Sequence, residues 1–99
     1  MKYTLRSTKR YNRWFAGLKD SKTKVKILAR LNRTENGNFG DFKHVSENLF
    51  ELRFFFAGGL RIYYTIHNDK VILLLAGGDK STQAKDIAKA HDLIDELED

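Results

Sequence analysis

Cysteine is absent from this 99-residue sequence, and its absence excludes both disulfide bonds and zinc-thiolate sites. The first ten residues, MKYTLRSTKR, contain no apolar run such as a signal peptide needs, and no window approaches the roughly 18 apolar residues of a membrane span. No two histidines have the four-residue spacing of a helical metal site, so we expect neither a metal ion nor another cofactor. The sequence therefore predicts a soluble, cytoplasmic protein that does not contact a membrane.

The length limits the number of hydrophobic cores that the chain can form. Hydrophobic residues make up 41% of the sequence and aromatic residues 12%, without any low-complexity tract. This is enough for one core and too little for two. We therefore expect one domain over residues 1–99.

Acidic residues are scarce in the first third of the chain. Residues 1–34 hold eleven of the eighteen Lys and Arg residues and a single acid, Asp20, which gives a balance of +10, whereas the rest of the chain carries −5. Such a basic segment is typical of proteins that meet phosphate backbones or an acidic protein partner. It also occurs where alternating lysines only solvate a helix, so charge alone suggests a class of partner and nothing sharper.

Hydrophobic periodicity and turn residues predict seven elements in the order β-α-α-β-β-β-α. The expected ranges are a strand at 2–6, a helix from Ser7 or Thr8 to about 17, a helix from Ser21 to about 36, strands at 49–56, 60–67 and 71–76, and a final helix from Ser81 or Thr82 to about 97. Residues 37–48 have turn formers at both ends and no period, which predicts a surface loop. Tight turns make the last three strands an antiparallel meander, and the fold class is α+β with the helices packed on one face of the sheet.

The second helix is expected to turn an apolar stripe inward and a basic side outward. Val25, Leu28 and Leu31 form that stripe, with Ile27 beside them. Arg30 falls with the lysines on the side that we expect to be solvated.

Charged side chains share one face of the predicted meander. Period-2 alternation places Glu51 and Arg53 opposite the apolar face of their strand, and it does the same for Arg61 and Tyr63. If both apolar faces look toward the core, these four residues collect on one solvent-facing patch, and Lys80 can reach its edge.

Arginine and lysine in one place, without a set of metal ligands, favour phosphodiester cleavage by charge stabilisation. Guanidinium groups make planar bidentate contacts to phosphate, and fixed cations lower the barrier where negative charge develops. The same residues are also compatible with an ordinary exposed pair of Glu51 and Arg53 beside a strand-face Arg61. His44 follows Lys43 in the predicted loop and is a candidate proton shuttle.

At these residues the sequence resembles a known family. The run ELR at 51–53, the glycine turn with G-x-R-I-Y-Y at 59–64, and D-K-S-x-Q-x-x-D-I-x-x-A at 79–90 are similar to the HigB-type, phage-derived Gp49-like branch of the RelE/ParE toxins. W-F-x-x-L before the basic helix and G-x-F-G-D-x-K before the meander extend the likeness over nearly the whole chain.

The resemblance implies a RelE-like fold and the toxin of a type II toxin-antitoxin system. Such a toxin enters the ribosomal A site and cuts mRNA with the message's own 2′-hydroxyl, leaving a 2′,3′-cyclic phosphate and a 5′-hydroxyl. It is held inactive by a cognate antitoxin, here expected to be a helix-turn-helix protein. The matched basic positions are Arg61 on the scissile phosphate, Arg53 on transition-state charge and Lys80 near the leaving 5′-oxygen. We expect Arg61 and Lys80 to lie on the solvated side of their elements.

Two departures from RelE leave the proton acceptor open. Asp86 stands where RelE has a catalytic tyrosine, and Glu51 stands where a lysine would precede Arg53 by two residues. Glu51 is the first candidate for the general base, with Lys43, His44 and Tyr63 as further candidates for this role or for RNA contact.

Other function classes share this fold or this charge. The ParE branch inhibits DNA gyrase without catalysis, and such an inhibitor is the alternative to the nuclease. A plain nucleic-acid-binding module is a third hypothesis. A cationic phosphate pocket favours the nuclease, because inhibition of gyrase does not need one.

Overall fold

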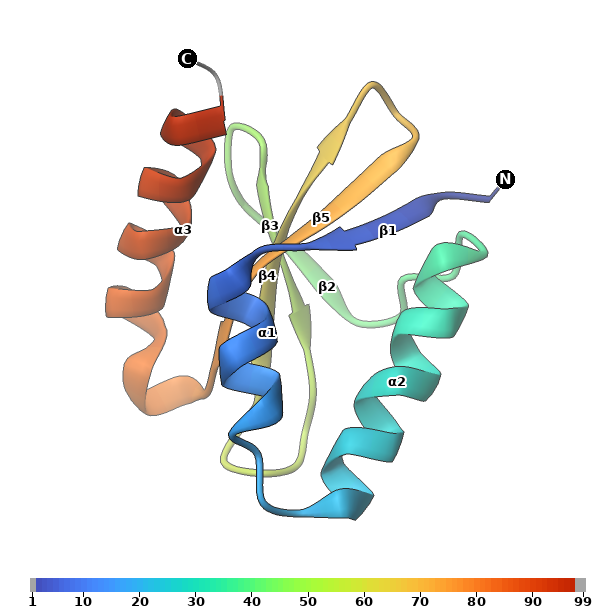
Figure 1. Cartoon of the computed structure of the whole chain (residues 1–99), viewed down its shortest axis with the longest axis vertical. Coiled ribbons are helices and arrows are strands. Elements are labelled where there is room, and N and C mark those ends of the chain that lie inside the picture. The colour runs from blue at the N-terminus through green and yellow to red at the C-terminus, as the bar shows by residue number, and fades with distance from the viewer. Residues whose placement is uncertain (1, 98–99) are drawn as a thin grey trace.

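Five strands build one mixed sheet in the computed structural model, which describes residues 2–97 (Figure 1). The elements in chain order are β1 (Thr4–Ser7), α1 (Lys9–Ala16), α2 (Ser21–Glu35), β2 (Phe42–Ser46), β3 (Leu49–Arg53), β4 (Arg61–His67), β5 (Val71–Gly78), the short 3-10 helix η1 (Lys80–Thr82) and α3 (Gln83–Leu97). The α+β class, the order of the helices and the three-stranded meander agree with the sequence prediction.

The sheet has the strand order β1-β5-β4-β3-β2. β1 runs parallel to β5, and every other neighbouring pair is antiparallel. The predicted loop over residues 37–48 is wrong in part, because residues 42–46 form the edge strand β2. Only β3 pairs with β2 in the described sheet, and most of the β2 side chains are exposed, so this strand shows little hydrophobic alternation.

The helices cover both faces of the sheet, which corrects the expectation that they share one. Ile27 and Leu31 of α2 and Tyr11 of α1 pack on one face, against residues such as Ile62 and Tyr64. Ala90 of α3 packs on the opposite face. Figure 1 shows α2 and α3 on either side of the strands. Each strand of the meander therefore lies between two apolar layers.

β5 contains a bulge that adapts it to these two layers. Tyr63 pairs with Ala76 and Tyr64 pairs with Leu74, which leaves Leu75 as an extra residue. Leu75 and Ala76 then both lie on the α3 side. A bulge of this kind turns consecutive side chains toward the same face.

Local capping fixes the helix starts. Thr8 accepts the backbone N–H of Tyr11 and caps α1, as predicted. The cap of α2 is Asp20 and not Ser21, and the cap of η1 is Asp79 and not Ser81 or Thr82. An aspartate accepts these N–H groups well because its charge also suits the helix N-terminus.

The buried stripe of α2 differs from the predicted one. It consists of Thr23, Ile27, Arg30, Leu31 and Thr34, whereas Val25 and Leu28 are exposed. Hydrophobicity does not identify the inward face of α2, because the buried stripe contains two threonines and an arginine and two aliphatic residues lie outside it. None of the helices over residues 2–97 is long and apolar enough to span a membrane.

Candidate active site

The register between β3 and β4 brings the predicted cluster together. Glu51 lies opposite Tyr63, and Arg53 lies opposite Arg61, so the four share one face as expected. The expectation that this face is solvated is wrong, because α3 covers it. Glu51 is 1% exposed, Tyr63 is fully buried and Arg61 is 4% exposed, whereas the Arg53 side chain is 36% exposed.

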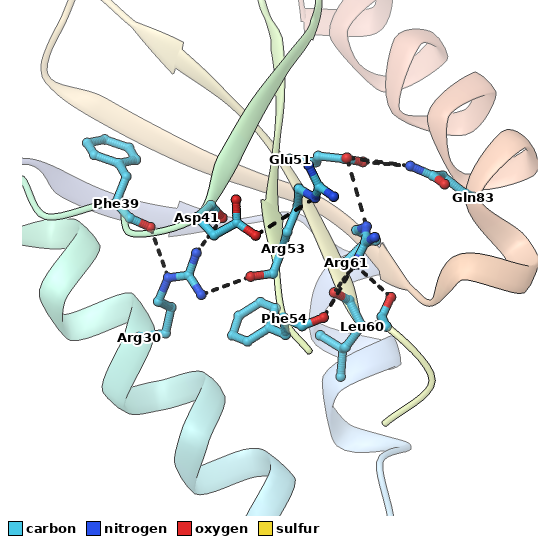
Figure 2. Close-up of polar contacts among 10 residues, drawn as sticks. Arg30, Phe39, Asp41, Glu51, Arg53, Phe54, Leu60, Arg61 and Gln83 are labelled. Atoms are coloured by element: carbon cyan, nitrogen blue, oxygen red, sulfur yellow. Dashed lines mark hydrogen bonds and ion pairs between the residues drawn. The ribbon is translucent and has the colours of Figure 1, made fainter. Parts of the chain in front are cut away.

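Glu51 and Arg61 form a buried ion pair. The Arg61 Nε lies 3.8 Å from Oε1 of Glu51, and the Gln83 side-chain amide of α3 donates to Oε2 of Glu51 at 3.1 Å (Figure 2). A buried carboxylate needs such partners because it has lost its water. Glu51 therefore holds Arg61 against the sheet and is itself held by α3.

Arg61 also orders the loop between β3 and β4. Its Nη1 donates to the carbonyls of Gly59 at 3.0 Å, Leu60 at 3.2 Å and Phe54 at 3.4 Å. The loop needs this support because Ala57, Gly58 and Gly59 all have positive φ angles. One guanidinium thus connects the buried carboxylate to the backbone of the loop.

Three of the predicted catalytic residues line one cavity. Its volume is about 230 Å³, and we call it the arginine-lysine pocket. The lining residues are Arg53, Phe54, Phe55, Gly58, Gly59, Arg61 and Lys80. The structure thus brings together Arg53, Arg61 and Lys80 from three separate elements.

The first turn of η1 sets the position of Lys80. The Asp79 side chain accepts the backbone N–H and the hydroxyl of Ser81, and these hydrogen bonds lower the pKa of Asp79 below its usual value. The Lys80 N–H donates to the Gly58 carbonyl at 3.4 Å. Its aliphatic chain packs over Gly59, where a Cβ atom would lie 2.9 Å from Lys80 Cγ. The Lys80 side chain therefore extends from a fixed base and is exposed.

Arg53 is positioned by Arg30, which the hydrophobic pattern of α2 had placed on the solvated side. Arg30 of α2 is 8% exposed, and its guanidinium donates to the carbonyls of Phe39, Asp41 and Arg53 at 2.5 to 3.0 Å (Figure 2). Asp41 Oδ2 lies 3.9 Å from Arg53 Nε. No local pattern marks Arg30, because its three acceptors lie 9 to 23 residues away. Gln83 was also missed as a site residue. It belongs to the D-K-S-x-Q motif at 79–83, and this motif could have identified it.

The other predicted residues lie outside the pocket. His44 stacks on Phe50 with ring centroids 4.9 Å apart, on the face opposite Arg53 and Arg61. This position does not support the proton-shuttle role that the sequence suggested for it. Lys43 is exposed and lies opposite Glu51 on the α3 side of the sheet. The pKa of Tyr63 is raised, first by burial and then by the negative charges of Glu51 and Asp86. A fully buried phenol with a raised pKa is poorly suited to accept a proton or to contact RNA.

Acidic and histidine side chains do not gather into a metal-binding group within residues 2–97. The charge-bearing groups that line the pocket are cationic, so its chemistry is that of anion binding. A phosphate group suits its size and charge.

The fold of this chain is similar to that of solved RelE toxins. The free Escherichia coli toxin RelE, solved as a double arginine-to-alanine mutant, is similar with a TM-score of 0.76 and 15% identity over 95% of this chain and 99% of that one. The Mycobacterium tuberculosis toxin-antitoxin complex RelBE2 gives a TM-score of 0.65 and 16% identity over 81% of this chain and 100% of the matched chain. The intact E. coli RelBE toxin-antitoxin complex gives 0.60 and 17% over 78% and 95%.

The sequence itself identifies the family. Residues 13–96 match the family described as phage derived protein Gp49-like (DUF891), and the chain belongs to this family. A Haemophilus influenzae protein described as uncharacterized is 43% identical over 97 residues, which is 98% of each chain. The predicted Gp49-like branch and the RelE-like fold are therefore confirmed.

Proposed function

We propose that the chain is the toxin of a type II toxin-antitoxin system, and that it cuts mRNA on the ribosome without a metal ion. The observation that carries this proposal is the arginine-lysine pocket, in which three elements of a RelE-like fold bring Arg53, Arg61 and Lys80 around a space for one phosphate. The fold alone does not distinguish a nuclease from a non-catalytic inhibitor. A convergent set of cations does favour phosphodiester chemistry.

The reaction is an internal transesterification. The 2′-hydroxyl of the RNA attacks the adjacent phosphorus and releases its proton to water, the P–O5′ bond breaks, and the departing 5′-oxygen receives a proton. The products are a 2′,3′-cyclic phosphate and a 5′-hydroxyl. Negative charge accumulates on the phosphate oxygens and on the 5′-oxygen as the bonds change.

Each pocket cation has a part in this scheme. Arg53, with a partly exposed side chain, contacts the phosphate oxygens as their charge increases. Arg61 provides a fixed positive charge at the wall of the pocket. Lys80 is exposed, and its ammonium group donates the proton to the 5′-oxygen.

Glu51 acts through Arg61 in this scheme. Its carboxylate is buried and bound to Arg61 and Gln83, and it does not line the pocket. A positioning role therefore fits its surroundings better than the general-base role suggested by the sequence.

An antitoxin is the expected protein partner. Two of the similar structures are toxin-antitoxin complexes. The basic N-terminal third of this chain offers a surface to which an acidic partner segment is attracted. We propose that a helix-turn-helix antitoxin neutralises this surface.

Inducible expression tests the proposal directly. We expect growth arrest and new 5′-ends within translated messages of cells that express the chain without its antitoxin, while Lys80→Ala gives neither. Primer extension maps the cuts, and gel analysis reports the integrity of chromosomal DNA. Intact mRNA together with broken DNA would instead support inhibition of gyrase.

A further inference from the structure

One phenylalanine stands out from the loop that closes the arginine-lysine pocket. Phe55 is 84% exposed, although its neighbours pack inward: Phe54 is buried and Phe56 is partly buried against the same core. A single exposed apolar side chain is common on protein surfaces. The position of Phe55, and the rigidity of the backbone beneath it, set it apart.

The backbone on both sides of Phe55 is held in place. The Phe54 N–H donates to the Leu60 carbonyl at 3.0 Å, and the Leu60 N–H donates to the Phe56 carbonyl at 3.1 Å. Arg61 adds its bonds to the carbonyls of Phe54, Gly59 and Leu60. The backbone that carries Phe55 is thus fixed, and a ligand that stacks on the exposed ring has little loop entropy left to overcome.

A second cavity lies on the far side of this ring. It has a volume of about 420 Å³ and runs along α2, and we call it the helix groove. Its lining residues are Lys26, Ala29, Arg30, Arg33, Asp41, Arg53, Phe54, Phe55 and Phe56. Arg53, Phe54 and Phe55 line both cavities, so they form a shared wall between the helix groove and the arginine-lysine pocket.

Cations flank the exposed ring on both sides. Lys26 and Arg33 of α2 line the helix groove, and Lys80 lines the pocket beyond the wall. Among the described residues that line the two cavities, the only carboxylate is that of Asp41, whose Oδ2 lies 3.9 Å from Arg53 Nε. Positive charge on either side of a flat aromatic surface matches a strand that carries phosphates between stackable bases.

We infer that Phe55 is a stacking platform for a nucleobase of single-stranded RNA, whose backbone continues from the arginine-lysine pocket into the helix groove. This inference deepens the proposed function and depends on RNA being the ligand. Stacking on a ring does not distinguish one base from another, so the platform positions the strand without selecting a sequence. An apolar protein partner has less to gain here, because the cations around Phe55 would lose water without finding phosphates.

RNA binding tests the platform separately from cleavage. The probe is a fluorescein-labelled 2′-O-methyl RNA of about eight nucleotides, which offers no 2′-hydroxyl for attack, and fluorescence anisotropy gives its affinity. We expect Phe55→Ala to weaken binding roughly tenfold and Phe55→Trp to preserve it. Phe42→Ala is the matched control, because Phe42 is another exposed phenylalanine and lines neither cavity.

Salt dependence tests the helix groove. Each of Lys26→Ala and Arg33→Ala is expected to weaken binding and to make the negative slope of log affinity against log salt shallower by about 0.7, the value for one phosphate contact on a single strand. Lys70→Ala, at the exposed turn between β4 and β5, is expected to leave the slope unchanged.

The two proposals fail in different ways. Wild-type RNA affinity in Phe55→Ala, or no RNA binding by the wild-type chain, contradicts the stacking role of Phe55, whether or not mRNA is cut. Contact with a protein partner would then explain the exposed ring better. RNA binding that depends on Phe55 in a chain that leaves mRNA intact supports the platform and contradicts the nuclease.

Discussion

Arg61 illustrates how one side chain can serve both the fold and the site. Its guanidinium pairs with the buried Glu51 and binds three carbonyls of the loop that carries Phe55. A substitution at Arg61 therefore removes a cation from the pocket and also releases the walls of that pocket. Loss of activity in such a variant would not by itself identify a catalytic group.

Stability is expected to fall sharply when Arg61 is removed. Arg61→Ala leaves the Glu51 carboxylate buried without its cation, and breaking a buried pair in this way costs about 3–5 kcal/mol. This replaces the expectation from sequence that Arg61 is a solvated residue. Urea denaturation of the wild type and the variant measures the free energy of unfolding.

The double variant Glu51→Gln/Arg61→Ala separates the lost cation from the stranded charge. The glutamine side chain is uncharged, so the double variant is expected to regain part of the stability that Arg61→Ala loses. An Arg61→Ala protein within about 0.5 kcal/mol of wild type, the range of ordinary surface positions, contradicts this account of the pair.

Some positions of individual side chains could be predicted from the sequence, and others could not. Alternation correctly placed Glu51, Arg53, Arg61 and Tyr63 on one face, because side-chain direction along a strand is a local property. It did not reveal that Glu51, Arg61 and Tyr63 are buried, because the helix that covers them, α3, is distant in the chain. Phe55 was hidden for the same reason: only the tertiary structure shows which phenylalanine of residues 54–56 stays outside.

At the scale of elements, prediction succeeded where burial gives a regular pattern. The meander and the helix ranges were found because each has an apolar period or a strong cap. The edge strand β2 was missed because one of its sides has no neighbouring strand within the described sheet and its side chains are mostly exposed. The face covered by α3 was also wrong, because hydrophobic residues on both sides of β4 and β5 do not say which helix covers which side.

The contact between β5 and α3 depends on Gly78. A Cβ atom there would lie 1.9 Å from Oδ2 of Asp86 and 2.6 Å from Oγ1 of Thr82. The added methyl group of Gly78→Ala must therefore displace the side chains of Asp86 and Thr82, whose mutual hydrogen bond of 2.6 Å joins η1 to α3 next to Lys80. We expect a loss of about 1–3 kcal/mol in the free energy of unfolding, together with slower cleavage.

Gly17→Ala is the matched control for this prediction. Gly17 caps α1 with a negative φ of −78°, and a Cβ atom there would meet only two carbonyl oxygens at 3.5 Å. We expect thermal unfolding of this variant to match the wild type or to occur at a slightly higher temperature. Equal stability of Gly78→Ala and Gly17→Ala would show that α3 is not held as closely as the structure indicates.

Across the whole molecule, charge is divided between the two sides of the sheet. The strongly basic helices α1 and α2 lie on one face, and α3, with four acids and two lysines, lies on the other. The arginine-lysine pocket takes its cations from β3, β4 and η1 and the rest of its lining from the loop between β3 and β4, and the helix groove continues from it to α2. α3 supports the pocket through Gln83, which donates to the Glu51 carboxylate that pairs with Arg61.

Single-turnover cleavage on programmed ribosomes tests whether the arginine-lysine pocket cuts mRNA on the ribosome. Lys80 is the residue to change, because its side chain is exposed and its loss is expected to cost little stability. We predict that the wild-type chain and Lys70→Ala cut the message at the same rate. Lys80→Ala is expected to cut at least about 100-fold more slowly with unchanged thermal unfolding. Lys80→Arg is not expected to restore the rate, because a guanidinium group donates a proton poorly. Cleavage by Lys80→Ala at the wild-type rate, or no cleavage by the wild-type chain, would show that the arginine-lysine pocket is not the active site of a ribosome-dependent nuclease.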